Sequence, residues 1–232
     1  MSGGNSPYGQ IGRHRTLANG IVKAECASGI TQKEGLGSPT NYIHGIVGVL
    51  ERLPVSLIDE VVERLCQAYL EDCTVYLFGN GGSAALASHA SCDLGKGSIR
   101  PGNRPFRVVS LTDNVSLITA WANDTNYENI FAAQLSPFIQ AGDIAFAISG
   151  SGNSPNVLNG LCAAREVGAS TIGLTGYRGG KMKALCDVCI TVPSENMQHI
   201  EDSHLCIMHA VFLAFRQFAD SAKVVKARSV PA

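Results

Sequence analysis

The sequence lacks the features by which several classes of protein are recognised. Its 232 residues carry 18 Lys and Arg against 19 Asp and Glu, and this near balance gives no support for binding to nucleic acid or to an anionic membrane surface. No apolar run reaches the length of a membrane span, and the first residues lack the apolar core of a secretory signal. We therefore expect a globular, cytoplasmic protein with neither a membrane nor a nucleic acid as partner.

The cysteines lack the spacing of a structural zinc site. Eight are present, but only Cys186 and Cys189 form a C-x-x-C pair, and such a site would need a second pair. The scattered positions of the others favour buried, reduced thiols over a redox or metal pair. Reduced thiols again indicate a cytoplasmic setting.

The composition of the chain changes once, near residue 40. Residues 1–40 are polar and rich in Gly and Ser, and we interpret them as a flexible or loosely attached extension. From residue 41 on, apolar residues repeat at helical spacing, and Pro54 is well placed to begin a second helix. No internal repeat is apparent, so residues 41–232 are interpreted as one domain.

Five short apolar segments alternate with helical patterns in this domain. Continuous hydrophobic runs separated by helices are typical of parallel strands that are buried between helices. The sequence therefore predicts an α/β protein with a parallel sheet. The expected strands cover residues 74–79, 106–112, 143–149, 170–176 and 188–193, and a helix from about Ile200 to Phe218 follows them.

Two glycine-rich loops follow the first and third expected strands. They read GNGGS at 79–83 and SGSGNS at 149–154, and a strand order of 2-1-3-4-5 would place them face to face where ligands bind in such sheets. The second loop is neither G-x-G-x-x-G nor a Walker loop. Ser154 can nevertheless cap a helix that begins at Pro155, and hydroxyls with close backbone N–H groups suit an anion. The pair of loops favours phosphate binding over an ordinary capped turn.

Imidazoles and carboxylates gather on two of the expected helices. His89 and Asp93 stand four residues apart, so they share a helix face, although an isolated pair of this kind is more often a surface feature. Glu201, His204 and His209 lie on the last helix, where a histidine beside the apolar stripe could simply be a core residue. Taken together, these side chains form a set that is capable of binding zinc.

Several motifs of the chain are those of one known family. GNGGSAALASHASCDL, AWAND, ISGSGNSPNVLNGLCAAREVG, TIGLTGYRGGKM and IEDSHLCIMH stand in this order between about Asn41 and the C-terminus. The sequence thereby resembles the sugar isomerase (SIS) domain family, and within it the phosphoheptose isomerase branch. The resemblance implies a flavodoxin-like three-layer sandwich with a five-stranded parallel sheet of order 2-1-3-4-5 and added N-terminal helices. It also implies a homotetramer with active sites at the subunit interfaces.

The resemblance assigns roles to individual positions. Asp93 is one methylene shorter than the Glu common in the family, and Glu201 stands where many members have Gln, which would strengthen cation binding. The residues implied for zinc are His89, Asp93, Glu201 and His209. Those implied for the phosphorylated sugar are Asn80, Gly81, Gly82, Ser83, Asn123, Asp124, Ser149, Gly150, Ser151, Ser154 and Glu201.

The activity implied is the conversion of sedoheptulose 7-phosphate to an aldoheptose 7-phosphate through a cis-enediol. This chemistry needs a base at C1 and C2 and an acid/base partner for the oxygen proton, for which Asp93 and His209 are the candidates. A zinc ion would polarise the carbonyl, and the ligand and base roles of Asp93 compete. The alternatives are a non-catalytic phosphosugar-binding regulatory protein of the same family and an isomerase of another phosphosugar.

One spacing on the last helix conflicts with the implied zinc set. Glu201 and His209 are eight residues apart, which is about 12 Å along a regular helix. They can bind one ion only if the helix begins late or bends near Glu201. His204 is the closer alternative by spacing, whereas the family pattern favours His209.

Overall fold

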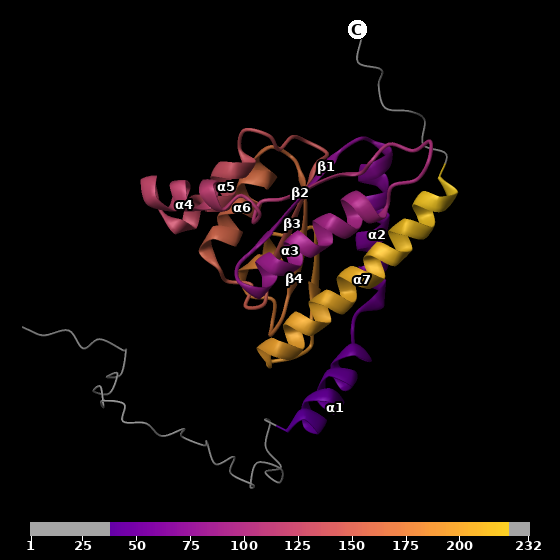
Figure 1. The fold of residues 1–232 in the computed structure, drawn as a ribbon. Helices are drawn as coiled ribbons and strands as arrows, with labels where there is room; N and C mark the ends of the chain where they lie inside the picture. Colours follow the sequence, from indigo (N-terminus) through magenta and orange to yellow (C-terminus); the bar gives the residue numbers. More distant parts are fainter. Residues whose placement is uncertain (1–37, 223–232) are drawn as a thin grey trace, which may run out of the picture.

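A computed structural model describes residues 38–222 as a parallel sheet between two layers of helices (Figure 1). The predicted extension 1–40 lies outside the described residues except at its end, where the first helix already begins at Pro39. The helices are α1 Pro39–Leu50, α2 Val55–Leu70, α3 Gly82–Cys92, α4 Val115–Asp124, α5 Ile130–Leu135, α6 Pro155–Glu166 and α7 Met197–Ser221. The strands are β1 Thr74–Gly79, β2 Arg107–Ser110, β3 Ile144–Ser149, β4 Ser170–Thr175 and β5 Val188–Thr191. Short helical turns are η2 Asp93–Gly97, η3 Tyr127–Asn129 and η4 Lys181–Ala184.

The five strands pair in parallel in the order β2-β1-β3-β4-β5. This confirms the predicted fold class and strand order. Gly79 at the end of β1 pairs with Ile148 near the end of β3, so the two glycine-rich loops leave the sheet side by side. The chain reverses its order at this point, which is where open parallel sheets bind ligands.

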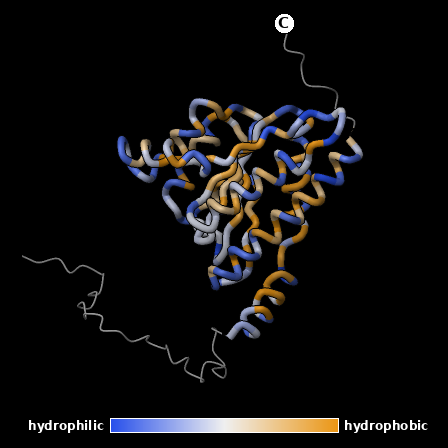
Figure 2. Tube along the Cα trace, viewed as in Figure 1, coloured by the Kyte–Doolittle hydropathy of each residue, from blue (hydrophilic) through white to orange (hydrophobic). Residues whose placement is uncertain are grey.

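Alternate residues of the central strands feed two separate cores. Leu77 and Phe146 point into the core beneath α2, α3 and α7, whereas Phe78 and Ala147 point into the core beneath α5 and α6. Successive strand residues face opposite sides, so a strand covered on both faces must be apolar throughout. All six residues of β1 and of β3 are buried, and Figure 2 shows the resulting apolar centre.

Strand β2 is an edge strand and, unlike β5 at the other edge, it has no buried residue. Its residues alternate between exposed and half-buried, and Val109 remains 43% exposed. The expectation that all five strands would be buried is therefore wrong for β2. α4 follows this strand, yet none of its ten residues is buried, so it leaves the edge uncovered.

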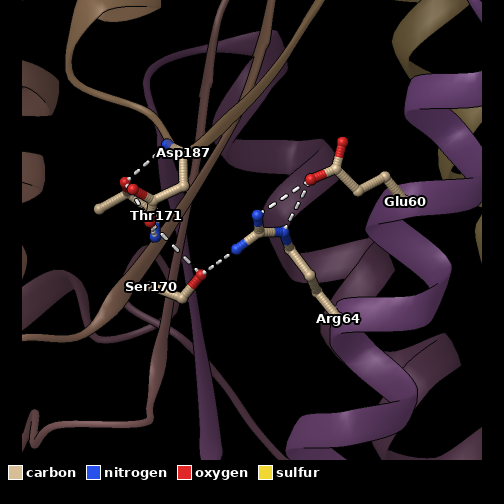
Figure 3. A network of polar contacts seen from close by, with 5 residues as sticks. All are labelled: Glu60, Arg64, Ser170, Thr171 and Asp187. Atoms are coloured by element: carbon tan, nitrogen blue, oxygen red, sulfur yellow. Dashed lines mark hydrogen bonds and ion pairs between the residues drawn. The ribbon is translucent and has the colours of Figure 1, made fainter.

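At the amino ends of the strands, called here the amino edge of the sheet, polar side chains form hydrogen bonds with one another (Figure 3). The Asp187 carboxylate accepts the Thr171 backbone N–H at 2.8 Å and the Thr171 hydroxyl at 3.1 Å. Arg64 donates to the Ser170 hydroxyl at 3.1 Å and pairs with Glu60 at 2.9 Å. These bonds connect α2 with the start of β4 and the turn before β5.

α1 is joined to the body through α7. The Tyr42 ring packs on the His199 ring with centroids 4.7 Å apart, and the Tyr42 hydroxyl donates to Asp202. Ile43 and Val47 nevertheless stay 56% and 48% exposed, and Figure 2 shows this apolar helix projecting from the body. Among the helices within residues 38–222, none combines the length and apolar character needed to cross a membrane.

Candidate functional site

Three of the predicted side chains converge between α3 and α7. The Nε2 atoms of His89 and His209 are 3.4 Å apart, and the Asp93 carboxylate lies 3.4 Å from the first and 3.9 Å from the second. Among the described residues this is a group of His, Cys, Asp or Glu side chains whose ligand atoms all lie within 4.8 Å of one another. Helix spacing brings His89 and Asp93 together, and the packing of α7 on α3 adds His209.

The spacing of these three atoms fits a small metal ion. Two ligands about 2.0–2.1 Å from zinc at a tetrahedral angle lie roughly 3.3–3.4 Å from one another. The His89–His209 and His89–Asp93 separations are both 3.4 Å, so they match this value, and the third separation is 3.9 Å. Three protein ligands with one open position is the arrangement of catalytic rather than structural zinc.

The cluster is half exposed in the single chain. The side chains of His89 and His209 are 48% and 47% exposed, and that of Asp93 is 26% exposed. Asp93 is the first residue of η2, a π-helical turn that continues α3. Such turns are rare and are frequently found at functional sites. A substrate can therefore reach all three side chains from one side.

Glu201 lies apart from this cluster. α7 runs as one helix from Met197, so it neither begins late nor leaves Glu201 free to approach His209. The Glu201 carboxylate instead lies over the start of α3, where a Cβ on Gly82 would meet its oxygens at 2.8 and 2.9 Å. Any larger residue at position 82 would require this exposed carboxylate to move. The structure thus offers three metal ligands rather than the expected four, and a ligand role for Glu201 stays a prediction.

The sequence did not decide whether His204 or His209 of α7 joins His89 and Asp93, and the two histidines have different surroundings. His204 is 1% exposed, and its Nε2 is 3.1 Å from the Thr175 carbonyl oxygen. Burial lowers the pKa of His204 to about 4, because the charged imidazole would lose its hydration. His204 is therefore a neutral core residue, and His209 is the histidine that joins His89 and Asp93.

A pair of amide side chains connects the two glycine-rich loops. Asn80 and Asn156 exchange hydrogen bonds of 2.9 and 2.8 Å, and the Tyr127 hydroxyl donates to the Asn80 oxygen at 3.0 Å. The expectation that the loops meet at the reversal of strand order is confirmed. Sequence reasoning missed Asn156 and Tyr127. Asn156 lies two residues beyond the SGSGNS loop, whereas nothing in the sequence marks Tyr127.

The serine loop, residues 149–154, is held by backbone bonds from the loop after β4. Gly176 N donates to Gly150 O at 2.9 Å, and Met182 N donates to Gly152 O at 2.9 Å. Gly152 has a φ of +64°, a conformation that side chains with a Cβ rarely adopt. These bonds fix the loop through its backbone and do not involve the serine hydroxyls.

Ser154 does not cap α6 as predicted. Its backbone precedes Pro155, but its side chain makes no bond to the first turn of the helix and instead accepts a 3.4 Å bond from Ser149. The Asn156 side chain instead accepts the N–H of Val157 in this turn at 3.0 Å, and Pro155 has no N–H. A helix start of this kind can accept an anion.

The structure places Asn123 and Asp124 in the last turn of α4, and their role in binding the sugar stays a prediction. They are exposed at the end of α4 and bond to one another at 2.9 Å, and within residues 38–222 they make no hydrogen bond to either loop. Sequence reasoning also missed a polar group that joins α3 to the loop after β2. There Ser88, the neighbour of His89, donates to Asp113 and lies 3.0 Å from the Thr112 hydroxyl.

Residues 41–176 match the SIS domain family. The chain is 35% identical over 191 residues to the phosphoheptose isomerase of Clostridium acetobutylicum, an alignment that covers 82% of this chain and 91% of that protein. It is 37% identical over 155 residues to the phosphoheptose isomerase of Pelobacter propionicus, with 67% of this chain and 82% of that protein covered.

The fold is also similar to solved structures. The structure of a phosphoheptose isomerase from Neisseria gonorrhoeae superposes with a TM-score of 0.71 at 30% identity, covering 79% of this chain and 97% of that one. That from Francisella tularensis superposes with a TM-score of 0.70 at 28% identity, covering 75% of this chain and 92% of that one.

Proposed function

This chain belongs to the SIS domain family, and we propose that it is an aldose–ketose isomerase that converts sedoheptulose 7-phosphate to an aldoheptose 7-phosphate. The observation that carries the proposal is the cluster of His89, Asp93 and His209, because it supplies proton-transfer and metal-binding groups between α3, which follows the glycine turn, and α7. A regulatory protein that only bound a phosphosugar would not need such a cluster.

The phosphate of the substrate is assigned to the serine loop. Ser149, Ser151 and Ser154 stand in the loop that leads into α6, and neutral hydroxyl donors with a helix dipole can hold a phosphate without Lys or Arg. Asn80 and the glycines at 81 and 82 approach the same region from β1. Glu201, above Gly82, and the pair Asn123–Asp124 are assigned to the sugar hydroxyls.

The length of the substrate suits the distance between the glycine turn and the His/Asp cluster. His89 lies seven residues beyond Gly82, which is about 10 Å along α3. An extended seven-carbon chain with its phosphate can bridge such a distance, whereas a triose phosphate cannot. This supports a long phosphosugar with its carbonyl end at the His/Asp cluster.

Proton transfer is assigned to Asp93 and His209. Isomerisation moves one proton between C1 and C2 and another between the two oxygens, and Asp93 takes the carbon proton while His209 serves the oxygen. Their side chains lie 3.9 Å apart, so both can contact adjacent atoms of one substrate. The half-exposed position of His209 lets it exchange its proton with water between turnovers.

We assign a zinc ion to the same cluster, with His89, Asp93 and His209 as its ligands. Bound there, zinc supplies a Lewis acid that polarises the carbonyl and stabilises the enediolate charge. A carboxylate or an imidazole nitrogen that donates to a metal is a weaker base, so the ligand and proton-transfer roles of Asp93 and of His209 oppose one another. The shorter Asp side chain in place of Glu makes this competition a property of this chain.

The test of the activity is direct. Purified protein is incubated with sedoheptulose 7-phosphate, and the anomeric NMR signals are followed with and without added zinc. We expect a new aldose signal and exchange of one carbon-bound proton in deuterated water. No new signal in either condition contradicts the isomerase, and turnover of a hexose phosphate alone identifies another phosphosugar as the substrate.

The metal is tested by its removal. Dialysis against a chelator should abolish turnover, and zinc should restore it. Asp93→Asn should weaken zinc binding by at least about 10-fold, the loss that follows even from changes around a ligand. Calorimetric titration measures the affinity, with Glu201→Gln as the matched control. Unchanged affinity in Asp93→Asn contradicts the metal assignment, and an equal loss in Glu201→Gln returns Glu201 to the ligand set.

We further propose that the protein acts as a homotetramer in the cytoplasm, with its sites between subunits. The apolar residues left open on α1 and α4 support the assembly: Ile43, Val47 and Val115 are 56%, 48% and 66% exposed. A hollow of about 780 Å³ beside β2, lined by Val109 and Trp121 among others, adds to this uncovered surface. Free thiols throughout residues 38–222 support a reducing compartment.

A further inference from the structure

The C-x-x-C pair takes no part in the proposed isomerase site. Cys186 precedes β5 and Cys189 lies within it, and both side chains are partly exposed. In the sheet Cys189 pairs with Gly173 of β4. A Cβ on Gly173 would lie 2.7 Å from the Cys186 sulfur and 3.3 Å from the Cys189 sulfur. The two sulfurs therefore lie over the same glycine, within about 6 Å of each other at most.

The two thiols are unequal partners. The Cys186 thiol donates a hydrogen bond to the Cys189 sulfur, which raises the pKa of Cys186 and lowers that of Cys189. Lys183, on the adjacent turn η4, also lowers the pKa of Cys189. A partly exposed cysteine next to a cation and a hydrogen-bond donor is the reactive type, because the thiolate is the nucleophile.

Metal binding does not account for the pair. Two thiolates need further ligands to hold zinc. Within residues 38–222 the grouping of three or more ligating side chains is the His/Asp cluster, which contains neither cysteine. The nearest carboxylate in sequence, Asp187, already accepts two hydrogen bonds from Thr171.

We propose that Cys186 and Cys189 form a thiol–disulfide exchange site for low-molecular-weight disulfides such as oxidised glutathione. The Cys189 thiolate attacks one sulfur of the small disulfide and expels one thiolate, which takes up a proton. The Cys186 thiol then loses its proton and attacks the mixed disulfide at Cys189, expelling the second small thiol. Two protein thiols are oxidised to one disulfide while one small disulfide is reduced to two thiols. The site rests on the thiols alone and not on the proposed isomerase function.

The test uses the full wild-type chain. Reduced protein is equilibrated without oxygen in mixtures of reduced and oxidised glutathione, quenched with acid and alkylated. Cleavage after Lys183 and Glu195 releases a fragment in which these are the two cysteines. We expect this fragment to carry an internal disulfide at ratios where the exposed Cys162 and Cys206 are at least about 10-fold less oxidised. Full alkylation at every ratio, or glutathione on both sulfurs, overturns the proposal.

Two variants test the order of attack. Cys186→Ser leaves no second thiol, so glutathione should remain on Cys189 as a stable mixed disulfide. Cys189→Ser removes the thiol partner that raises the pKa of Cys186 most, but partial burial still raises it, so glutathione should reach Cys186 at least about 10-fold more slowly. Cys162→Ser is the control and should behave as the wild type. Equal rates at the two positions overturn the assignment of Cys189 as nucleophile, and zinc binding that both variants abolish identifies a metal site instead.

Discussion

The amino and carboxyl ends of the strands, which form two edges of the sheet, both carry polar side chains. These side chains are paired with one another at the amino edge and left open toward the carboxyl edge. At the amino edge, hydrogen bonds join the side chains of Asp187, Thr171 and Ser170 to one another and to backbone groups. At the carboxyl edge the serine loop is held by backbone bonds, and about 10 Å further along α3 the His/Asp cluster remains half exposed. Polar groups that are paired internally contribute to stability, whereas polar groups left open are available to a ligand. Substitutions at the two edges should therefore change different quantities.

The largest effect is expected from His209→Ala. Loss of a general acid/base group reduces turnover by about 10³-fold. The side chain is 47% exposed, so the free energy of unfolding should change little. Steady-state kinetics and urea unfolding measure the two quantities, and Cys206→Ala, an exposed change on the same helix, serves as control. A variant that keeps its turnover would contradict the assignment of His209.

The buried histidine of the same helix should show its effect in stability. The pKa of His204 is about 4 in the folded chain, against 6.5 for a histidine in water, so the unfolded chain binds the proton more readily. The neutral form stabilises the fold above pH 6.5, and this contribution is lost as the pH falls toward 4. By pH 4.5 the loss is about 2.5 kcal/mol.

The measurement compares urea unfolding of the wild type and His204→Gln at pH 7 and pH 4.5. Gln cannot take up a proton but can still donate to the Thr175 carbonyl. All other titrating groups are shared, so the difference between the proteins isolates His204. Equal losses of stability in the two proteins would show that His204 is not the group that titrates.

A smaller effect is expected at the amino edge. Asp187→Ala leaves the Thr171 backbone N–H without its acceptor, while the Thr171 hydroxyl can still donate to the Leu185 carbonyl, and the free energy of unfolding should fall by about 2 kcal/mol. Turnover by the remaining folded protein should not change. Glu60→Ala removes the acid of a more exposed ion pair, at 41% exposure, and should cost less than about 1 kcal/mol. If Asp187→Ala lowers turnover without lowering stability, the two edges are not separate in function.

The sequence by itself determined what depends on neighbouring residues along the chain. The apolar runs of β1 and β3 predicted buried strands, because a strand covered on both faces must be apolar at every position. The spacing of His89 and Asp93 placed them on one helix face, since four residues make about one turn. The family motifs added the strand order that brings the glycine turn to the serine loop.

Only the tertiary structure decided which side chains meet across elements. His204 and His209 are alike in sequence, and the packing of α7 buries the first against Thr175 and turns the second toward α3. The same packing places Glu201 over Gly82 rather than beside His209. Periodicity within a helix defines its faces, but which neighbour each face contacts depends on how whole elements pack. For this reason the helix carrying the candidate site could be predicted, whereas its third ligand could not be chosen from spacing.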